Sequence, residues 1–209
     1  AQALGLIPEG APLGAMLPVL RQWDALEPGA RALAIREMQV NAAMLEAMDF
    51  HIGRLVEHLK RTGAYENTVF VMTSDNGPEG GDLTMGSPLQ VALIDLWMGD
   101  NGYTATELDQ LGGPGSWVAI GPEWASAAAS PSRLFKFHGA DGALRVPLIL
   151  SGPGIPAGRQ VDGLALMTDV MPTLLDLTSA GEAPAGARPM TGRSLLPALR
   201  EAGAAIYGE

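Results

Sequence analysis

The feature that most constrains the fold is a long helical repeat followed closely by an apolar strand. Mostly apolar side chains recur at spacings of four and three between Gly29 and Arg61, which predicts one long amphipathic helix. The positions on this face are Ala34, Met38, Asn41, Leu45, Met48, Ile52, Leu55 and Leu59. Gly63 is suited to end the helix in a left-handed conformation. After a short turn, the residues from Thr68 to Ser74 predict a strand.

This strand is almost entirely apolar, which is typical of a strand buried on both faces of an α/β sheet. A second apolar strand is predicted between Arg145 and Pro156. A short helix is predicted from Asp169 to Thr178 with Thr168 as its N-cap, and a closing helical turn from Ser194 to Arg200. Because helices alternate with apolar strands, we expect an α/β fold with helices on both faces of the sheet.

Residues 77–142 differ in composition, because they are rich in Gly, Ala and Ser with several tryptophans among them. Leu89 to Trp97 is predicted to be helical, and the rest is predicted to be mostly loop. Long loops in compact domains are usually either functional or disordered. The aromatic side chains favour an ordered loop. The stretch 182–189 is predicted to be a linker or surface loop.

The overall composition excludes several classes of function. Of the 209 residues, 47% are hydrophobic and 17% are charged, a balance typical of one globular domain or a substantial part of one. The net charge of −10 and the scattered basic residues argue against nucleic acid or a membrane surface as a partner. The absence of cysteine excludes disulfides and thiolate metal sites within the chain.

No targeting segment is recognisable in this sequence. The first residues lack the basic and apolar parts of a signal peptide. No apolar run approaches the roughly 20 residues that a membrane span requires. The compartment therefore stays open between cytoplasm and periplasm.

Two oxygen-bearing side chains, those of Asp75 and Asn76, stand where the first strand ends. Ligands in open α/β sheets gather beyond the carboxyl ends of the strands. A carboxylate and an amide carbonyl suit Ca²⁺ or Mg²⁺ better than a soft metal, although two oxygens are too few to hold such an ion alone. The alternative is an ordinary turn, because Asp and Asn followed by Gly commonly reverse the chain.

Five blocks of sequence resemble the sulfatases, in particular the bacterial arylsulfatase branch of the alkaline-phosphatase superfamily. They occur in the family's order: MLEAMDFHIGRLVEHLKRTG, NTVFVMTSDNGPEG, SPSRLFKFHGADGALRVPLILSGPG, MTDVMPTLLDL and GRSLLPAL. The resemblance implies part of an alkaline-phosphatase-like sandwich, with a mostly parallel sheet and helices on both faces. The chain, 1–209, then corresponds to the middle and late part of the catalytic domain. Within it, 29–81 is the helix with the metal-binding strand, 82–142 the substrate-side loops, and 143–209 a strand with closing helices.

The resemblance also implies roles for individual residues. Asp75 and Asn76 match the Asp-Asn pair that completes a divalent-cation site, usually calcium, with Mg²⁺ as the other candidate. Lys136 matches the catalytic lysine that contacts a substrate sulfate oxygen and stabilises charge on the leaving oxygen. Arg145 is expected to brace its loop. His138 matches no catalytic position of the family, and neither Glu79 nor Asp141 is singled out.

The sulfatase nucleophile is a formylglycine made from Cys or Ser in a Cys/Ser-x-Pro-Ser-Arg motif, which the family places far upstream of the Asp-Asn strand. Residues 130–133 have the Ser-Pro-Ser-Arg order, but they lie downstream of that strand with Ala129 before them. We interpret them as the segment that precedes the lysine and not as a degenerate nucleophile motif. The chain is therefore expected to need an N-terminal part of its own domain, and to be inactive alone.

The implied function is hydrolysis of a small-molecule sulfate monoester. A phosphodiesterase or phosphonate monoester hydrolase of the same superfamily is one alternative, because sulfate and phosphate esters present similar tetrahedral oxyanions. A noncatalytic fragment or binding module is the other. The sequence does not identify the alcohol part of the substrate.

Overall fold

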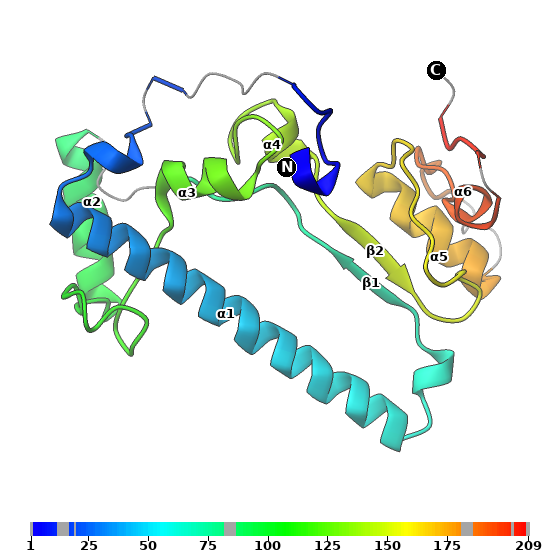
Figure 1. Cartoon of the computed structure of the whole chain (residues 1–209). Coiled ribbons are helices and arrows are strands. Elements are labelled where there is room, and N and C mark those ends of the chain that lie inside the picture. The colour runs from blue at the N-terminus through cyan, green and yellow to red at the C-terminus, as the bar shows by residue number, and fades with distance from the viewer. Residues whose placement is uncertain are drawn as a thin grey trace. The chain divides into compact units, whose positions relative to one another are not determined.

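A computed structural model describes residues 2–11, 17–18, 20–81, 87–180, 186–201 and 203–207. The helices are α1 (Pro28–Arg61), α2 (Pro88–Asp100), α3 (Gly121–Ala128), α4 (Asp141–Leu144), α5 (Val170–Thr178) and α6 (Leu196–Arg200). Single 3₁₀ turns are η1 (Gln2–Leu4), η2 (Trp23–Ala25), η3 (Tyr65–Asn67) and η4 (Met167–Asp169). The strands are β1 (Phe70–Thr73) and β2 (Leu148–Ser151) (Figure 1). The chain divides into two compact units, residues 1–57 with 73–147 and residues 58–72 with 148–209.

The long helix predicted from the sequence is confirmed as α1, which runs to Arg61 as expected. It ends in the hydrogen-bond pattern of a Schellman motif. The Ala64 amide donates to the Leu59 carbonyl (2.9 Å) and the Gly63 amide to the Lys60 carbonyl (3.2 Å). Gly63 has φ of 73°, the left-handed conformation predicted for it. None of the helices described in the chain is long and apolar enough to cross a membrane.

β1 and β2 form a two-stranded sheet in which the strands run antiparallel. Gly152, which follows β2, lies against Thr68 and Val69, which precede β1. The end of one strand is thus next to the start of the other, and the arrows in Figure 1 point in opposite directions. Helices and this two-stranded sheet occur together in the described residues.

A mostly parallel sheet with helices on both faces is not found in the described residues. The strand predicted from Thr68 to Ser74 is shorter, and its residues are half-buried or exposed instead of buried on both faces. Met72, for example, is 50% exposed. An apolar run shows that a strand can be buried, but it fixes neither the direction of the neighbouring strand nor what covers each face.

The core of the first unit is built around Phe135, Leu20 and Ala125, with Leu17 and Ile120 packed against it. Ala125 belongs to α3, a helix in a region that the sequence predicted to be mostly loop. The Trp124 indole donates to the Ala34 carbonyl (2.8 Å), which joins α3 to the start of α1.

α2 confirms and extends the helix predicted from Leu89 to Trp97. Ser87 and Gln90 form a capping box at its start. At its other end, the rings of Trp97, Tyr103 and Trp117 contact one another, with centroid separations of 5.1–5.8 Å. These contacts agree with an ordered loop over the residues that the structure describes here, whereas 82–86 lie outside them.

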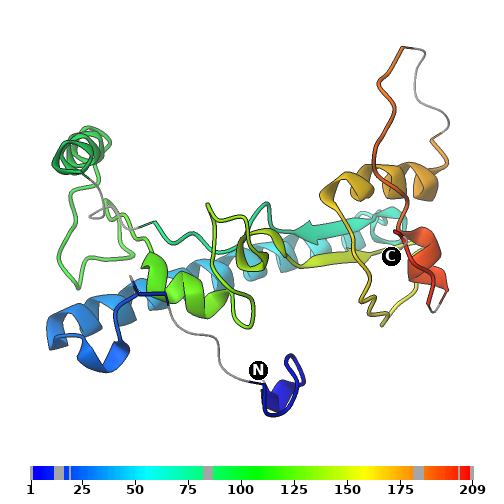
Figure 2. The ribbon, with the colours of Figure 1, turned by 90° about the horizontal axis from the view of Figure 1, so that it is seen from above.

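In the second unit, α5 and α6 lie beside the segment that follows β2 (Figure 2). The Arg200 guanidinium donates to the Gly154 carbonyl (3.5 Å), and the Arg159 guanidinium to the Ala198 carbonyl (3.2 Å). The predicted helix from Asp169 to Thr178 is confirmed as α5. The predicted N-cap is wrong, because Thr168 lies inside η4 and Asp169 precedes the helix. The linker predicted at 182–189 lies partly outside the described residues.

Asp169 is the centre of a buried polar cluster in this unit. Its carboxylate is fully buried and accepts from the Leu166 amide (2.7 Å), the Arg193 amide (2.8 Å) and the Tyr207 hydroxyl. Burial opposes the charged carboxylate, but these hydrogen bonds and the Arg193 guanidinium outweigh it and lower the pKa of Asp169. The Thr173 hydroxyl donates to the Asp169 carbonyl (2.6 Å) and accepts from the Leu195 amide (2.9 Å).

Candidate functional site

The segment 75–81 leaves β1 as a bend that is held by a distant part of the chain. The Gly77 amide donates to the Ala143 carbonyl (2.8 Å) instead of closing a reverse turn with Ser74. The Ser74 hydroxyl donates to the Asn76 carbonyl (2.7 Å), and the Asn76 side-chain amide donates to the Gly77 carbonyl (2.9 Å). An ordinary reverse turn, the alternative reading of Asp75 and Asn76, therefore explains only part of this geometry. The bend is also held by its hydrogen bond to the segment that contains Ala143.

Two glycines allow this close approach. A Cβ atom at Gly77 would overlap the carbonyl oxygen of Gly142, and a Cβ atom at Gly142 would overlap the carbonyl oxygen of Leu134. The neighbouring atoms are main-chain atoms, which cannot move aside as a flexible side chain can. Gly77 is therefore required where the two segments dock, and Gly142 is required where the loop that carries Lys136 closes on itself.

The loop that carries Lys136 is fixed by its main chain. The Lys136 amide donates to the Pro78 carbonyl (3.0 Å), and the Gly142 amide donates to the Arg133 carbonyl (3.0 Å). Leu134 and Phe137, on either side of Lys136, have φ of 67° and 73°, which non-glycine residues rarely adopt. Such strained conformations persist only where the surrounding structure imposes them.

Residues next to Lys136 hold the loop from both sides. Phe135 is buried in the core of the first unit. The imidazole Nδ1 of His138 lies 3.0 Å from the Phe135 carbonyl oxygen, and the two rings meet edge to face at 4.9 Å. Since a carbonyl can only accept, Nδ1 is the donor. His138 therefore helps to hold the loop.

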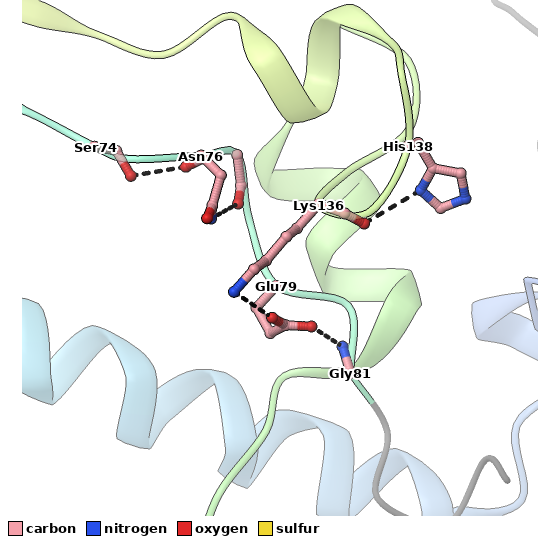
Figure 3. A network of polar contacts seen from close by, with 7 residues as sticks. Ser74, Asn76, Glu79, Gly81, Lys136 and His138 are labelled. Carbon is pink, nitrogen blue, oxygen red and sulfur yellow. Dashed lines mark hydrogen bonds and ion pairs between the residues drawn. The ribbon is translucent and has the colours of Figure 1, made fainter. Parts of the chain in front are cut away.

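The Lys136 ammonium extends toward the segment that carries Asn76 and Glu79 (Figure 3). Its Nζ lies 2.7 Å from Glu79 Oε2, while Glu79 Oε1 accepts from the Gly81 amide (3.0 Å). The ion pair with Glu79 raises the pKa of Lys136, and the Asp75 carboxylate raises it further. The ammonium is therefore close enough to both carboxylates to respond to their charge.

Asp75 and Asn76 keep oxygens available for a ligand. The Asp75 carboxylate is exposed and accepts no hydrogen bond from the described residues. The side-chain nitrogen of Asn76 donates a hydrogen bond to the Gly77 carbonyl. The side-chain carbonyl oxygen of Asn76 has no hydrogen-bond partner among the described residues. The described residues contain no group of three His, Cys, Asp or Glu side chains that could hold a metal ion.

The structure thus brings the three predicted site residues, Asp75, Asn76 and Lys136, to the same two docked segments. Arg145 and Asp141 are exposed, and their side chains form no hydrogen bond or ion pair with the described residues. Arg145 therefore does not brace the loop through its guanidinium. Sequence reasoning missed the role of Glu79 as the partner of Lys136, because nothing in the sequence shows that two segments so far apart meet.

Comparison with known proteins identifies the family. The family model described as Sulfatase matches residues 17–180. The chain belongs to the sulfatase family. An arylsulfatase of Klebsiella aerogenes is 36% identical over 180 residues, 84% of this chain and 36% of that enzyme. An uncharacterized sulfatase of Schizosaccharomyces pombe is 35% identical over 178 residues, and a choline-sulfatase of Rhizobium meliloti is 27% identical over 178 residues.

This sulfatase chain spans about a quarter to a third of the length of these relatives. The matched residues are 31% of the Schizosaccharomyces pombe protein and 24% of the choline-sulfatase, although they cover 83% and 85% of this chain. Family membership implies the alkaline-phosphatase-like α/β class.

Proposed function

We propose that this chain forms part of the active site of an arylsulfatase-like enzyme that cleaves sulfate monoesters. Within that site, Asp75 and Asn76 contribute to a cation site and Lys136 contacts the sulfate group. The observation that carries the proposal is the docking of the Lys136 loop on the segment 75–81. Two main-chain hydrogen bonds, Gly77 to Ala143 and Lys136 to Pro78, hold the backbone of the lysine loop against the segment that carries the two oxygen-bearing residues.

The residues present fit one side of a calcium or magnesium site. An exposed carboxylate without a donor and a free amide carbonyl are the hard oxygen ligands that these ions prefer. Calcium takes about 6–8 oxygen ligands, so Asp75 and Asn76 supply only part of the set. A bound divalent cation would supply Lewis-acid stabilisation of the negative sulfate oxygens.

Lys136 is placed to act on an anionic substrate. Its raised pKa keeps the ammonium charged through neutral and mildly alkaline pH. A fixed positive charge near the ester stabilises the negative charge that develops on the leaving oxygen as the bond to sulfur breaks. The strained loop and the buried neighbour Phe135 limit how far the ammonium can move.

The remainder of the site is proposed to come from sequence outside this chain. A formylglycine nucleophile and the other metal ligands are expected there, because the chain has no cysteine and spans a third of its relatives. The 209 residues alone are expected to bind calcium weakly and to show no turnover.

The test is an assay of the full-length protein that contains this chain. It should release 4-nitrophenol from 4-nitrophenyl sulfate with saturation, and chelation of divalent cations should abolish the activity. Lys136→Ala should lower kcat/KM about 100- to 1,000-fold. Arg145→Ala removes a nearby exposed cation and should change kcat/KM less than about threefold, which separates a specific contact from a general charge effect.

Two outcomes would overturn the proposal in favour of the alternatives. Faster turnover of a 4-nitrophenyl phosphodiester than of the sulfate ester would indicate a phosphodiesterase. Tight calcium binding without hydrolysis of any sulfate or phosphate ester would indicate a noncatalytic binding module.

A further inference from the structure

Glu79 is the charged residue of the site that the proposed function leaves without a role. Its carboxylate bridges two groups, the Lys136 ammonium at 2.7 Å and the Gly81 amide at 3.0 Å. Figure 3 shows it between the extended lysine and the chain that follows. The ammonium also lies over the Phe137 ring, with its Nζ 5.2 Å from the ring centroid. Glu79 is thus the carboxylate that the described residues place in direct contact with Lys136.

The pair changes how the site attracts an anion. A free ammonium acts on a substrate as a single positive charge, and the attraction grows in proportion to the charge of the substrate. With a carboxylate at 2.7 Å, the same ammonium acts as one end of a dipole, whose field falls off faster with distance. A second negative charge on the substrate then gains little from Lys136 and is repelled by Glu79.

Sulfate monoesters and phosphate monoesters differ in this charge. A sulfate monoester carries one negative charge at neutral and alkaline pH, whereas a phosphate monoester carries close to two, since its second pKa is about 6. The two groups have nearly the same shape, so size cannot separate them well. Neutralisation of the Lys136 charge can separate them, because a doubly charged phosphate ester then gains no extra attraction over a singly charged sulfate ester.

We propose that Glu79 is a specificity-determining residue that tunes the site to singly charged esters by neutralising Lys136. The inference rests on the proposed function of Lys136 as the substrate-contacting cation. It also addresses the sulfate-or-phosphate choice that Asp75, Asn76 and Lys136 leave open, since all three suit either anion.

The first test measures kcat/KM for 4-nitrophenyl sulfate and 4-nitrophenyl phosphate with the full-length protein and with Glu79→Gln. Glutamine preserves the shape and keeps one oxygen, which can accept from the Gly81 amide, so the substitution removes the charge and the acceptor that faces Lys136. For charges roughly 6 Å apart and an effective dielectric constant between about 20 and 80, the ratio of phosphate to sulfate turnover should rise about 3- to 100-fold. An equal decrease in kcat/KM for both substrates would show that Glu79 has only a structural role and would overturn the proposal.

Asp141→Asn is the matched control for the change in net charge. Asp141 is an exposed carboxylate at the start of α4, and its side chain forms no hydrogen bond or ion pair with the described residues. Its substitution should leave the ratio unchanged within about twofold, because an exposed charge is screened by solvent. A shift as large as that of Glu79→Gln would mean that total charge, not the ion pair, sets the preference, and would also overturn the proposal.

A binding assay separates this proposal from the proposed function. The dissociation constants of benzenesulfonate and phenylphosphonate, measured at a pH where the phosphonate carries two charges, need no turnover. Glu79→Gln should strengthen binding of the phosphonate relative to the sulfonate by a similar factor. If the ratio shifts but no ester is hydrolysed, the enzymatic proposal fails and the role of Glu79 stands. If the esters are hydrolysed but neither ratio shifts, only the role of Glu79 fails.

Discussion

Asp75 and Asp169 are two aspartates of one chain with opposite surroundings. Asp169 is fully buried, and its carboxylate accepts from two main-chain amides and a tyrosine hydroxyl. Asp75 is exposed and accepts from no donor in the described residues. A buried carboxylate has to be satisfied by its own protein, whereas a ligand-binding carboxylate has to keep its lone pairs free. The same side chain therefore stabilises the fold in one unit and is available for chemistry in the other.

The largest effect that would test this difference between the two aspartates is expected on the catalytic activity of an Asp75 variant. Asp75→Ala should lower kcat/KM of the full-length protein about 1,000-fold, because it removes a proposed cation ligand. The free energy of unfolding should change by less than about 0.5 kcal/mol, since an exposed side chain without partners is lost. Steady-state kinetics and urea denaturation measure the two quantities. A large loss of stability with unchanged kinetics would break the comparison.

Asp169→Ala should produce the opposite pattern. The Leu166 and Arg193 amides and the Tyr207 hydroxyl would lose their common acceptor inside the protein, which should destabilise it by about 3–5 kcal/mol. Hydrogen exchange of the Leu166 and Arg193 amides should accelerate, as mass spectrometry of the corresponding peptides can show. Unchanged protection of both amides would contradict the assigned role.

Gly77→Ala tests whether the site depends on the close contact with Gly142. The added methyl group would force the two main chains apart, and overpacking of this kind costs about 1–3 kcal/mol. Turnover should fall with it, because the same contact holds the Lys136 loop in place. Gly139→Ala is the control, because a Cβ atom there meets no other atom within 4 Å. Equal effects of the two substitutions would argue against the docking contact.

The smallest expected effects concern the pH dependence of stability in the Asp169 cluster. The pKa of Asp169 is lowered in the folded protein, so its contribution is complete above about pH 4 and is lost as the pH falls through the folded pKa. The hydrogen bond to Asp169 raises the pKa of Tyr207, so the contribution of Tyr207 is lost only as the pH rises above about 10. Thermal unfolding midpoints measured across pH should fall in two places, an acid limb due to Asp169 and an alkaline limb due to Tyr207. Asp169→Asn should flatten the acid limb, and an unaltered acid limb in that variant would exclude Asp169 as its source.

The sequence predicted the regular elements well and the contacts between them poorly. The period of α1 and the glycine at its end are local properties, and both are confirmed. The direction of β2 relative to β1 depends on how the chain returns over 74 to 147, which no local pattern encodes. The prediction of Thr168 as N-cap was wrong, because the buried Asp169 carboxylate accepts from the Leu166 amide at the start of the turn before α5. This hydrogen bond depends on the burial of Asp169, which the local sequence does not encode.

For the candidate site, Asp75, Asn76 and Lys136 were identified by family resemblance, and their roles stay predictions. The structure adds the docking of their segments. Glu79 could not be assigned from sequence, because an acidic residue in a Gly-rich loop is ordinarily a solvated charge. Only the contact with Lys136 across a long sequence separation separates it from Asp141.

The junction between the Lys136 loop and the segment after β1 uses main-chain atoms that every amino acid except proline carries. Its hydrogen bonds run between main-chain amides and carbonyls. Gly77 allows the closest approach of the two segments, and Gly142 allows the Lys136 loop to close on itself. Side chains around the junction can therefore diversify among descendants or engineered variants while the alignment of the lysine persists. New substrate preferences can be introduced by changing surrounding side chains, provided that these two positions keep hydrogen in place of a methyl group.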